Sequence, residues 1–394
     1  MRISTCRIYS PRTLYPSFIL TTLTNVFSIR NKEGKKENLL GVSVQKQFIQ
    51  SIANTVGTDF TKYKVVKKGQ FTYIPDTSRR GDKIAIALLE DYEEGLVSNV
   101  YTVFEVIDTE KLLPEYLMLW FSRPEFDRYA RFKSHGSVRE VMDWEEMCKV
   151  ELPVPDIEKQ RKIVKAYKTI TDRIDLKQKI NDNLEATLTA IFKKMFIEDN
   201  TISFCNKKLY ELTETIDNRG KTPPNNNIET PYPLIEIASL RTDGRIATYR
   251  NCSKFVTEEV YNSWFRSGHP KQKDILMSTV GSLAELKLFW GDKGSIAQNI
   301  VAFRCYDNNL PMYLYQYLLR KQHELAAYEI GSVQASIKVS QVIEYDIAIP
   351  PKELLDSFDK ISTQLTELIY QNEADIDVCH KLSDTLLQRL TLQD

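Results

Sequence analysis

The chain contains an internal repeat whose two copies are offset by 195 residues. The tripeptide Gly-Ser-Val at 136–138 recurs at 331–333, and the strand-like stretch 150–155 recurs at 345–350. A long helical pattern follows each copy, and the first continues without glycine to about Phe196. Agreement of this length in one register indicates a duplicated unit, each copy made of a globular domain followed by a long helix.

Hydrophobic periodicity in the two helices predicts that they pair. Apolar residues of the first helix recur at alternating steps of four and three, which is the spacing of a coiled-coil seam. A helix of some 40 residues is on the order of 60 Å long and cannot bury its apolar stripe alone. We therefore expect the two helices to pack against each other, the alternative being two unrelated helices that each pack on their own domain. The predicted seam and partner-binding positions are Ile163, Tyr167, Ile170, Ile174, Lys177, Asn181, Leu184, Leu188, Phe358, Leu365, Leu368, Asn372, Asp375 and Leu386.

The middle of each predicted seam is polar, and we call these four residues the polar waist: Lys177, Asn181, Asn372 and Asp375. If the two helices run antiparallel, their middles meet, and Lys177 then faces Asp375. Polar residues in a seam fix the alignment of the helices at some cost in stability.

Composition sets the outer limits. With 394 residues, 42% hydrophobic and 27% charged, the chain has room for two or three domains with full cores. No run of 18 apolar residues occurs and the N-terminus lacks the apolar stretch of a signal peptide, so we expect no membrane span. Six cysteines and four histidines are dispersed without a C-x-x-C pair. This pattern predicts reduced thiols, a cytoplasmic protein and no metal site.

The charge balance argues against a simple nucleic-acid binder. The formal net charge is zero; residues 1–155 carry 22 basic and 20 acidic side chains, and residues 201–350 carry 17 and 16. Neither region has the basicity of an independent DNA-binding domain. If DNA is the ligand, local basic patches or a partner protein must supply much of the phosphate contact.

The sequence predicts a mixed α/β fold for both globular regions. The stretch 100–107 is β-branched and aromatic and predicts a strand, while Pro114 follows at the first position of a predicted helix. Asp143 and Glu146 have the spacing of a helix capping box. A strand at 300–305 and a helix from Pro311 repeat the first of these features. The other loops differ in length and sequence, as expected of one scaffold with two separate specificities.

A search for catalytic motifs leaves none. There is no G-x-G-x-x-G or P-loop, and the segment 222–225 lacks both ends of an amino-methyltransferase motif. A nuclease would hold Mg²⁺ with paired acids and a lysine on neighbouring strands. Asp156, Asp175 and Lys177 match the sequence pattern of such a site. The two acids, however, lie along one predicted helix, roughly 28 Å apart by helical rise. We expect no catalytic residue in this chain.

Several segments together resemble the specificity subunit of a type I restriction–modification system. The stretch 136–164 resembles the end of a target-recognition domain that continues into the first conserved helix of such a subunit. Residues 331–353 resemble the second copy of this junction. Asp-Asn-Arg-Gly-Lys-Thr-Pro at 217–223 resembles the loop that often opens such a domain, and 274–281 resembles the segment that usually follows it.

The resemblance implies a complete architecture. It implies a mixed α/β chain in which two target-recognition domains are separated by two long helices, packed antiparallel as a spacer with a pseudo-twofold repeat. The expected domains are 1–155 (first recognition domain), 156–200 (first spacer helix), 201–350 (second recognition domain) and 351–394 (second spacer helix).

The resemblance also implies a role. Such subunits have no catalysis of their own, and each recognition domain reads one half of a bipartite double-stranded DNA target. Two methyltransferase subunits dock on the helices and bring S-adenosylmethionine, and a separate motor–nuclease subunit completes the restriction enzyme. A different class of protein also fits the sequence: a duplicated coiled-coil scaffold that joins two proteins and never meets DNA.

The predicted DNA contacts are basic residues in expected loops, where arginine or lysine can read guanine or hold phosphate. They are Arg79, Arg80, Lys83 and Arg139 in the first domain, and Arg219, Lys221, Lys271, Lys273 and Lys338 in the second.

Overall fold

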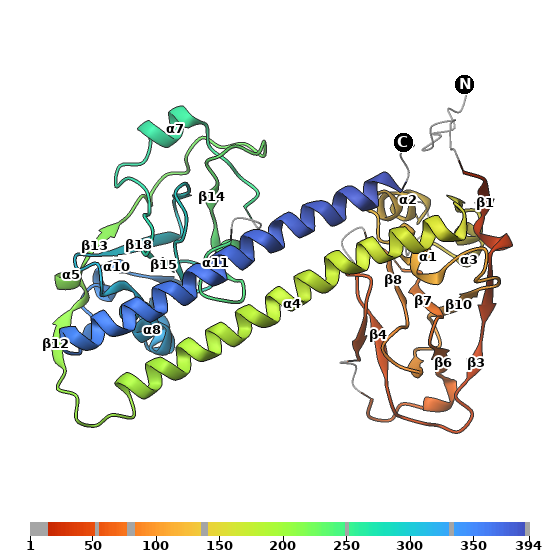
Figure 1. The fold of residues 1–394 in the computed structure, drawn as a ribbon, viewed down its shortest axis with the longest axis horizontal. Helices are drawn as coiled ribbons and strands as arrows, with labels where there is room; N and C mark the ends of the chain where they lie inside the picture. The colour runs from red at the N-terminus through yellow and green to blue at the C-terminus, as the bar shows by residue number, and fades with distance from the viewer. Residues whose placement is uncertain are drawn as a thin grey trace. The chain divides into compact units, whose positions relative to one another are not determined.

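The computed structural model describes residues 15–51, 55–76, 83–134, 141–248, 252–330 and 335–390. The chain forms two compact units, each described here by itself: Met1–Arg173 with Cys379–Asp394, and Ile174–Val378. Two long helices, α4 (Ile157–Phe196) and α11 (Lys352–Arg389), contribute to both units (Figure 1).

The first unit is built on a four-stranded antiparallel sheet with the order β2-β10-β7-β8. Its strands are β2 (Thr24–Phe27), β7 (Phe71–Ile74), β8 (Ala85–Leu88) and β10 (Thr102–Val106). Three helices follow the sheet in sequence: α1 (Pro114–Phe121), α2 (Pro124–Ser134) and α3 (Trp144–Cys148). The smaller sheets pair β1 (Ser17–Ile19) with β11 (Glu151–Pro153), β6 (Lys64–Lys67) with β3 (Ile29–Arg30) and β9 (Glu94–Val97), and β4 (Leu40–Val42) with β5 (Phe48–Gln50). Two short 3₁₀ helices, η1 (Leu20–Thr22) and η2 (Phe60–Lys62), complete the unit.

Aromatic side chains dominate the core of the first unit. Phe71 of β7 stacks on Phe104 of β10 with ring centroids 4.9 Å apart, and Phe121 of α1 meets both rings edge-on. Leu387 near the end of α11 is buried in this core, and Tyr167 of α4 packs against it. The N-terminal part of α4 and the C-terminal part of α11 are therefore integral to the first unit.

The second unit repeats the same sheet. Its strand order β13-β18-β15-β16 corresponds to β2-β10-β7-β8. The strands are β13 (Thr213–Ile216), β15 (Ile275–Ser278), β16 (Leu286–Leu288) and β18 (Ile300–Cys305). Smaller pairs join β12 (Cys205–Lys208) to β21 (Asp346–Ile349), β14 (Leu234–Ile235) to β17 (Ser295–Ile296), and β19 (Glu329–Ile330) to β20 (Ser336–Ile337). The shorter helices are α5 (Leu209–Leu212), α6 (Ile237–Leu240), α7 (Glu258–Ser263), α8 (Pro311–Arg320), α9 (Gln322–Ala326) and α10 (Val339–Val342).

The spacer helices are also part of the second core. Phe192 and Phe196 near the end of α4 pack against Tyr313 of α8, with ring centroids 5.5 and 4.9 Å away. The same two rings meet Phe358 of α11 at 5.6 and 5.3 Å. One aromatic cluster thus joins both helices to the globular domain of this unit.

The predicted repeat and its local elements are confirmed. The strand predicted at 100–107 is β10, and the helix predicted from Pro114 begins at that residue. Asp143 caps α3 by accepting a hydrogen bond from the Glu146 backbone N–H at 2.9 Å. In the second copy α8 begins at Pro311.

The two units also share a backbone contact in which one partner, Val141 or Ser336, follows the 195-residue offset. In the first unit Asp76, just after β7, forms an antiparallel bridge with Val141. In the second, Val280, just after β15, forms the same bridge with Ser336. The segment after the third strand of each sheet is therefore adjacent to the segment that leaves the Gly-Ser-Val tripeptide.

The polar waist lies within the second unit, where α4 and α11 run antiparallel. Lys177 is 3.0 Å from the Asp375 carboxylate, which confirms the predicted pairing, and it donates to Asn372 Oδ1 at 2.7 Å. Asn372 in turn donates to Asn181 Oδ1 at 2.8 Å, and Asn181 donates to Glu373 at 2.8 Å. These bonds satisfy two asparagines that are almost fully buried.

One predicted seam residue is wrong. Leu368 is 48% exposed, whereas its neighbour Ile369 is only 2% exposed and belongs to the core of the second unit. The reason is that α11 covers the recognition domain as well as α4, so its buried stripe is displaced toward the domain. Small polar side chains, Ser362 and Thr366, occupy that stripe where the domain comes close.

We predict that the polar waist determines register more than stability. Replacing all four of its residues with leucine should raise the melting temperature, because polar groups in a seam stabilise less than packed apolar groups. The same change should loosen the single alignment of the helices. Thermal melts and distance measurements between labels on the two helices would measure the two effects. A clear fall in melting temperature would count against this view.

Among the described residues, no helix combines the length and apolar character needed to cross a membrane.

Candidate DNA interface

The loop at 217–222 of the second unit is held rigidly at its base. Asn218 is 2% exposed; its amide donates to the Gly268 carbonyl at 2.9 Å and accepts from the Ser267 backbone N–H at 2.9 Å. Gly220 has φ = 113°, in the region that glycine adopts most easily. The loop therefore leaves β13 as a fixed turn.

Arg219 is oriented by its neighbour. Its Nε and Nη2 donate to the two oxygens of Asp217 at 2.9 and 2.7 Å. Partial burial by itself raises the pKa of Asp217, but hydrogen bonds and charge attraction from Arg219 outweigh it and bring that pKa below its ordinary value. Asp217 consequently stays ionised and holds the half-buried guanidinium in one orientation, as bidentate pairs do.

Arg266 is a functional candidate that sequence reasoning missed. It is exposed, and its guanidinium donates to the backbone carbonyls of Asp217 at 3.2 Å and Arg219 at 2.9 Å. Two cations, Arg219 and Arg266, thus share one loop, and the exposed Lys221 follows two residues after Arg219. The turn-like sequence at 266–268 was the available signal, because such segments are typically exposed loops.

Gln298 joins this cluster from the turn between β17 and β18. It is exposed, its φ is 41°, and its side-chain amide donates to the Thr222 hydroxyl. A positive φ at a residue other than glycine is uncommon and often marks a functional position. We call Arg219, Lys221, Arg266 and Gln298 the second-domain loop cluster.

The other predicted contacts of the second domain lie apart from this hydrogen-bonded cluster. Lys271 is exposed, and Lys338 is exposed immediately before α10. Lys273 instead forms an ion pair with Asp359 of α11, with Nζ–oxygen distances of 2.9 and 3.1 Å. This contact gives Lys273 a role in attaching the domain to the helix.

In the first domain, Arg79, Arg80 and Arg139 lie outside the described residues. Lys83 is exposed, and the backbone that follows it is fixed by a buried ion pair. Lys46 Nζ lies 2.6 Å from Asp127 Oδ1 and donates to the Ile84 carbonyl at 2.8 Å; the same carboxylate accepts from the Ile84 N–H at 3.2 Å. Burial lowers the pKa of Lys46, while attraction to Asp127 partly restores it.

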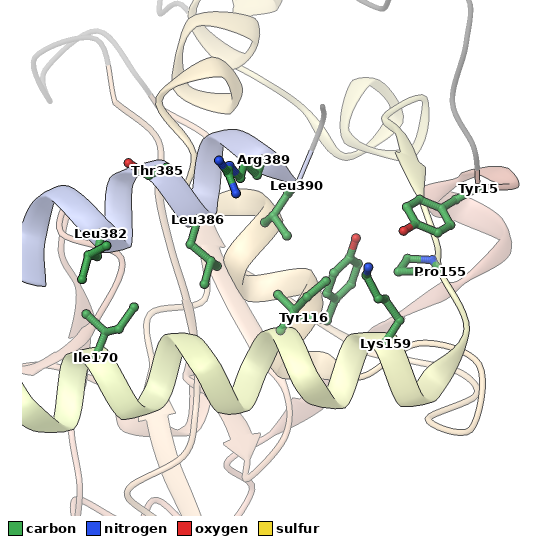
Figure 2. Close-up of a pocket in the computed structure, with 11 residues that line it drawn as sticks. Tyr15, Tyr116, Pro155, Lys159, Ile170, Leu382, Thr385, Leu386, Arg389 and Leu390 are labelled. Atoms are coloured by element: carbon green, nitrogen blue, oxygen red, sulfur yellow. The ribbon is translucent and has the colours of Figure 1, made fainter. Parts of the chain in front are cut away.

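The two helices also line an apolar groove of about 410 Å³ within the first unit. Figure 2 shows Ile170 of α4 facing Leu382 and Leu386 of α11, with Leu390 and Tyr116 farther along. Predicted seam residues Ile163, Ile170 and Leu386 therefore line the open side of the interhelical groove.

Two features of the described residues concern metal binding and nucleophilic chemistry. No group of three or more histidine, cysteine and acidic side chains there could hold a metal ion. Burial raises the pKa of the Cys305 thiol far above its ordinary value, so this cysteine is held as a neutral thiol.

A family model for the type I restriction modification DNA specificity domain matches the chain twice, over residues 20–186 and 203–373. The chain belongs to this family. The two matches cover the two recognition domains and much of each spacer helix, so the resemblance noted from the sequence is confirmed.

Two curated relatives are named as specificity subunits of type I restriction enzymes. The type I restriction enzyme MjaIX specificity subunit of Methanocaldococcus jannaschii is 24% identical over 305 residues, which is 72% of this chain and 70% of that protein. The HindI specificity subunit of Haemophilus influenzae is 28% identical over 137 residues, which is 34% of this chain and 29% of that protein.

A solved structure supports the fold. The type I restriction-modification S subunit from M. genitalium aligns with 98% of both chains at a TM-score of 0.59, although the sequences are only 13% identical. The chain is thus a DNA-recognition specificity subunit with two specificity domains in a mixed α/β fold.

Proposed function

We propose that each globular domain reads one half of a bipartite double-stranded DNA target, and that the chain performs no catalysis itself. The duplication of the sheet carries this proposal. In both units the end of the third strand is bridged to the segment after the Gly-Ser-Val tripeptide. The predicted contact Lys338 lies two residues after the bridged Ser336, whereas the equivalent residue of the first unit is Asp143. Equivalent positions thus carry different residues, as two half-site specificities require.

In the second domain, the loop cluster is the proposed base-reading element. Arg219, held by Asp217, has the planar fork that binds guanine O6 and N7, and Gln298 has the amide that pairs with adenine in the major groove. Lys221, Arg266 and Lys271 are proposed to hold phosphates and orient the domain. Lys338 and, in the first domain, Arg79, Arg80, Lys83 and Arg139 remain proposed contacts.

The proposed protein partners are two methyltransferase subunits and a restriction motor subunit. Within the second unit, α4 exposes Leu176 and Ile180, and α11 exposes Ile361 and Leu368. Leu176 and Ile180 are one helical turn apart, and neighbouring exposed apolar side chains of this kind support a docking site. The methyltransferase would bring S-adenosylmethionine and would contribute phosphate contacts, which agrees with the zero net charge of this chain.

A gel shift tests the proposal against the scaffold alternative. The chain should shift a mixed duplex library weakly alone and strongly with its cognate methyltransferase subunit. Sequencing of the bound duplexes should give two defined half-sites. A stable complex with the methyltransferase that retains no duplex would favour the scaffold.

Single substitutions should separate base reading from phosphate binding. We expect Arg219→Ala to weaken binding by about 1–3 kcal/mol and to relax preference at one base pair. Lys221→Ala should weaken binding of all sequences alike and reduce the salt dependence by about one ion. Lys207→Ala, which removes an exposed lysine of β12, is the matched control and should bind as the wild type. Unchanged base preference in Arg219→Ala would exclude Arg219 as a reader.

A further inference from the structure

Arg245 is a buried cation. Because its side chain is covered, it does not contact DNA directly. It lies in the loop between α6 and α7 and is 1% exposed. Its Nε lies 3.1 and 3.0 Å from the two carboxylate oxygens of Glu185 on α4, and its backbone N–H donates to the same carboxylate at 2.8 Å. The loop backbone and the guanidinium are thus both attached to one residue of the first spacer helix.

The same guanidinium reaches the second spacer helix. Arg245 Nη1 donates to Thr366 Oγ1 of α11 at 3.3 Å, and Nη2 lies 3.5 Å from Gln316 Oε1 of α8. Gln316 continues to Thr189 of α4 at 3.4 Å. The Tyr315 ring lies 5.6 Å from the guanidinium carbon and closes the site. One side chain therefore connects the recognition domain, α4 and α11.

Neighbouring contacts keep the loop that carries Arg245 in place. Lys287 of β16 is buried and donates to the backbone carbonyls of Thr242 and Gly244. Two further side chains of the domain reach α11: Lys273 contacts Asp359, and Trp290 Nε1 donates to Glu367 at 2.9 Å. Asp359 and Glu367 are eight residues apart, about 12 Å along the helix. Lys273 and Trp290 attach the domain to α11, whereas Arg245 contacts both helices and adds an ion pair with α4.

Stability alone is a poor reason for such a residue. Burial of an ion pair costs desolvation energy that its attraction often only offsets, and well-packed apolar residues commonly stabilise as much. A bidentate arginine pair does supply directional geometry that an apolar contact lacks. Arg245 therefore contributes orientation more than stability.

We propose that Arg245 is a positioning residue that holds the second recognition domain in one orientation on α4 and α11, and thereby restricts the complex to one gap between half-sites. This inference rests on the proposed bipartite reading. One additional base pair moves a half-site by about 3.4 Å and rotates it by roughly 35° around the duplex. To follow that shift, the domain must turn on the helices, and the Glu185 and Thr366 contacts of Arg245 cannot both persist.

The test measures gap discrimination in the complex with methyltransferase. Arg245→Met removes the guanidinium group and keeps an unbranched apolar side chain. Glu185→Gln keeps a neutral hydrogen-bonding partner for Arg245. Arg241→Met, an exposed arginine of the same loop, is the matched control. Each complex would methylate duplexes that carry both half-sites at the native gap or at a gap one base pair shorter or longer.

We expect Arg245→Met to raise methylation at the two altered gaps by about tenfold or more relative to the native gap, with both half-site sequences unchanged. Glu185→Gln should show a smaller effect in the same direction, and Arg241→Met none. Strict gap choice in folded Arg245→Met, or in Glu185→Gln if Arg245→Met does not fold, would overturn the inference. If the wild-type complex recognises no bipartite site, the proposed function fails instead, so the two failures are distinguishable.

Discussion

Replacing residues 201–350 with the matching region of another specificity subunit should change one half of the methylated sequence and leave the other half unchanged. The reason is that the second domain has its own sheet and its own loop cluster, built without strands from the first. Its first and last strands, β12 and β21, pair with each other. A graft that includes both strands therefore keeps the exit of the domain closed.

Methylome sequencing of a host that expresses the chimera and its methyltransferase is the direct measurement. The reciprocal graft, which replaces residues 1–155, is the matched control and should change the other half alone. The first chimera should preferably keep an arginine facing Glu185 and Thr366, so that orientation is not altered with specificity. A change in both half-sites from either single graft would contradict independent reading.

The scaffold was the part of the structure that the sequence predicted best. Local sequence determines backbone geometry, and Pro114 at the start of α1 is a signal of that kind. The polar waist is a signal of a helix seam, and the 195-residue offset is a signal of a repeat. They were confirmed because each depends on residues close in sequence or on a repeated pattern. Leu368 was misplaced because a heptad pattern describes a helix with one neighbour, whereas α11 has α4 on one side and a domain on the other.

The candidate site was predicted only in part, for a related reason. Arg219 and Lys221 lie within a motif, but Arg266 and Gln298 join them through hydrogen bonds between residues 47 and 76 positions apart. Nothing local in the sequence distinguishes those two residues from other loop residues. Lys273 likewise looked like a loop cation, yet its partner Asp359 lies on α11. Tertiary packing, and not the local amino-acid sequence, determines which charged residues pair over long sequence separations.

Part of the equal number of basic and acidic residues in this chain is accounted for by such ion pairs. Arg304 lies 2.7 Å from the buried Asp274, and Arg245 pairs with Glu185 as described. Cations and acids of this kind cancel each other inside the fold and add nothing to the field at the surface. The charge count therefore underestimates how basic a local loop can be, and exposed cations such as Lys221 and Arg266 are compatible with a neutral chain.

Insertion of four helix-forming residues after Asn183 in α4, matched by four after Gln371 in α11, should lengthen the unspecified gap by one or two base pairs and preserve both half-sites. Each insertion adds about one turn, roughly 6 Å, and a base pair spans about 3.4 Å along the duplex. Both positions lie between the polar waist and the attachment of Arg245 to Glu185 and Thr366. The waist contacts and the domain contacts are therefore left intact while the helix between them grows.

An insertion in α4 alone is the informative comparison. It moves Glu185 by about one turn relative to Thr366, so Arg245 can keep only one of its two helix partners. We expect this variant to lose a single defined gap, in contrast to the clean lengthening from the matched pair. Methylome reads that show the original gap with altered half-sites after the matched insertion would refute the idea that these helices measure the spacing. The contrast between the two variants also separates helix length, which sets the distance, from the Arg245 contact, which sets the orientation.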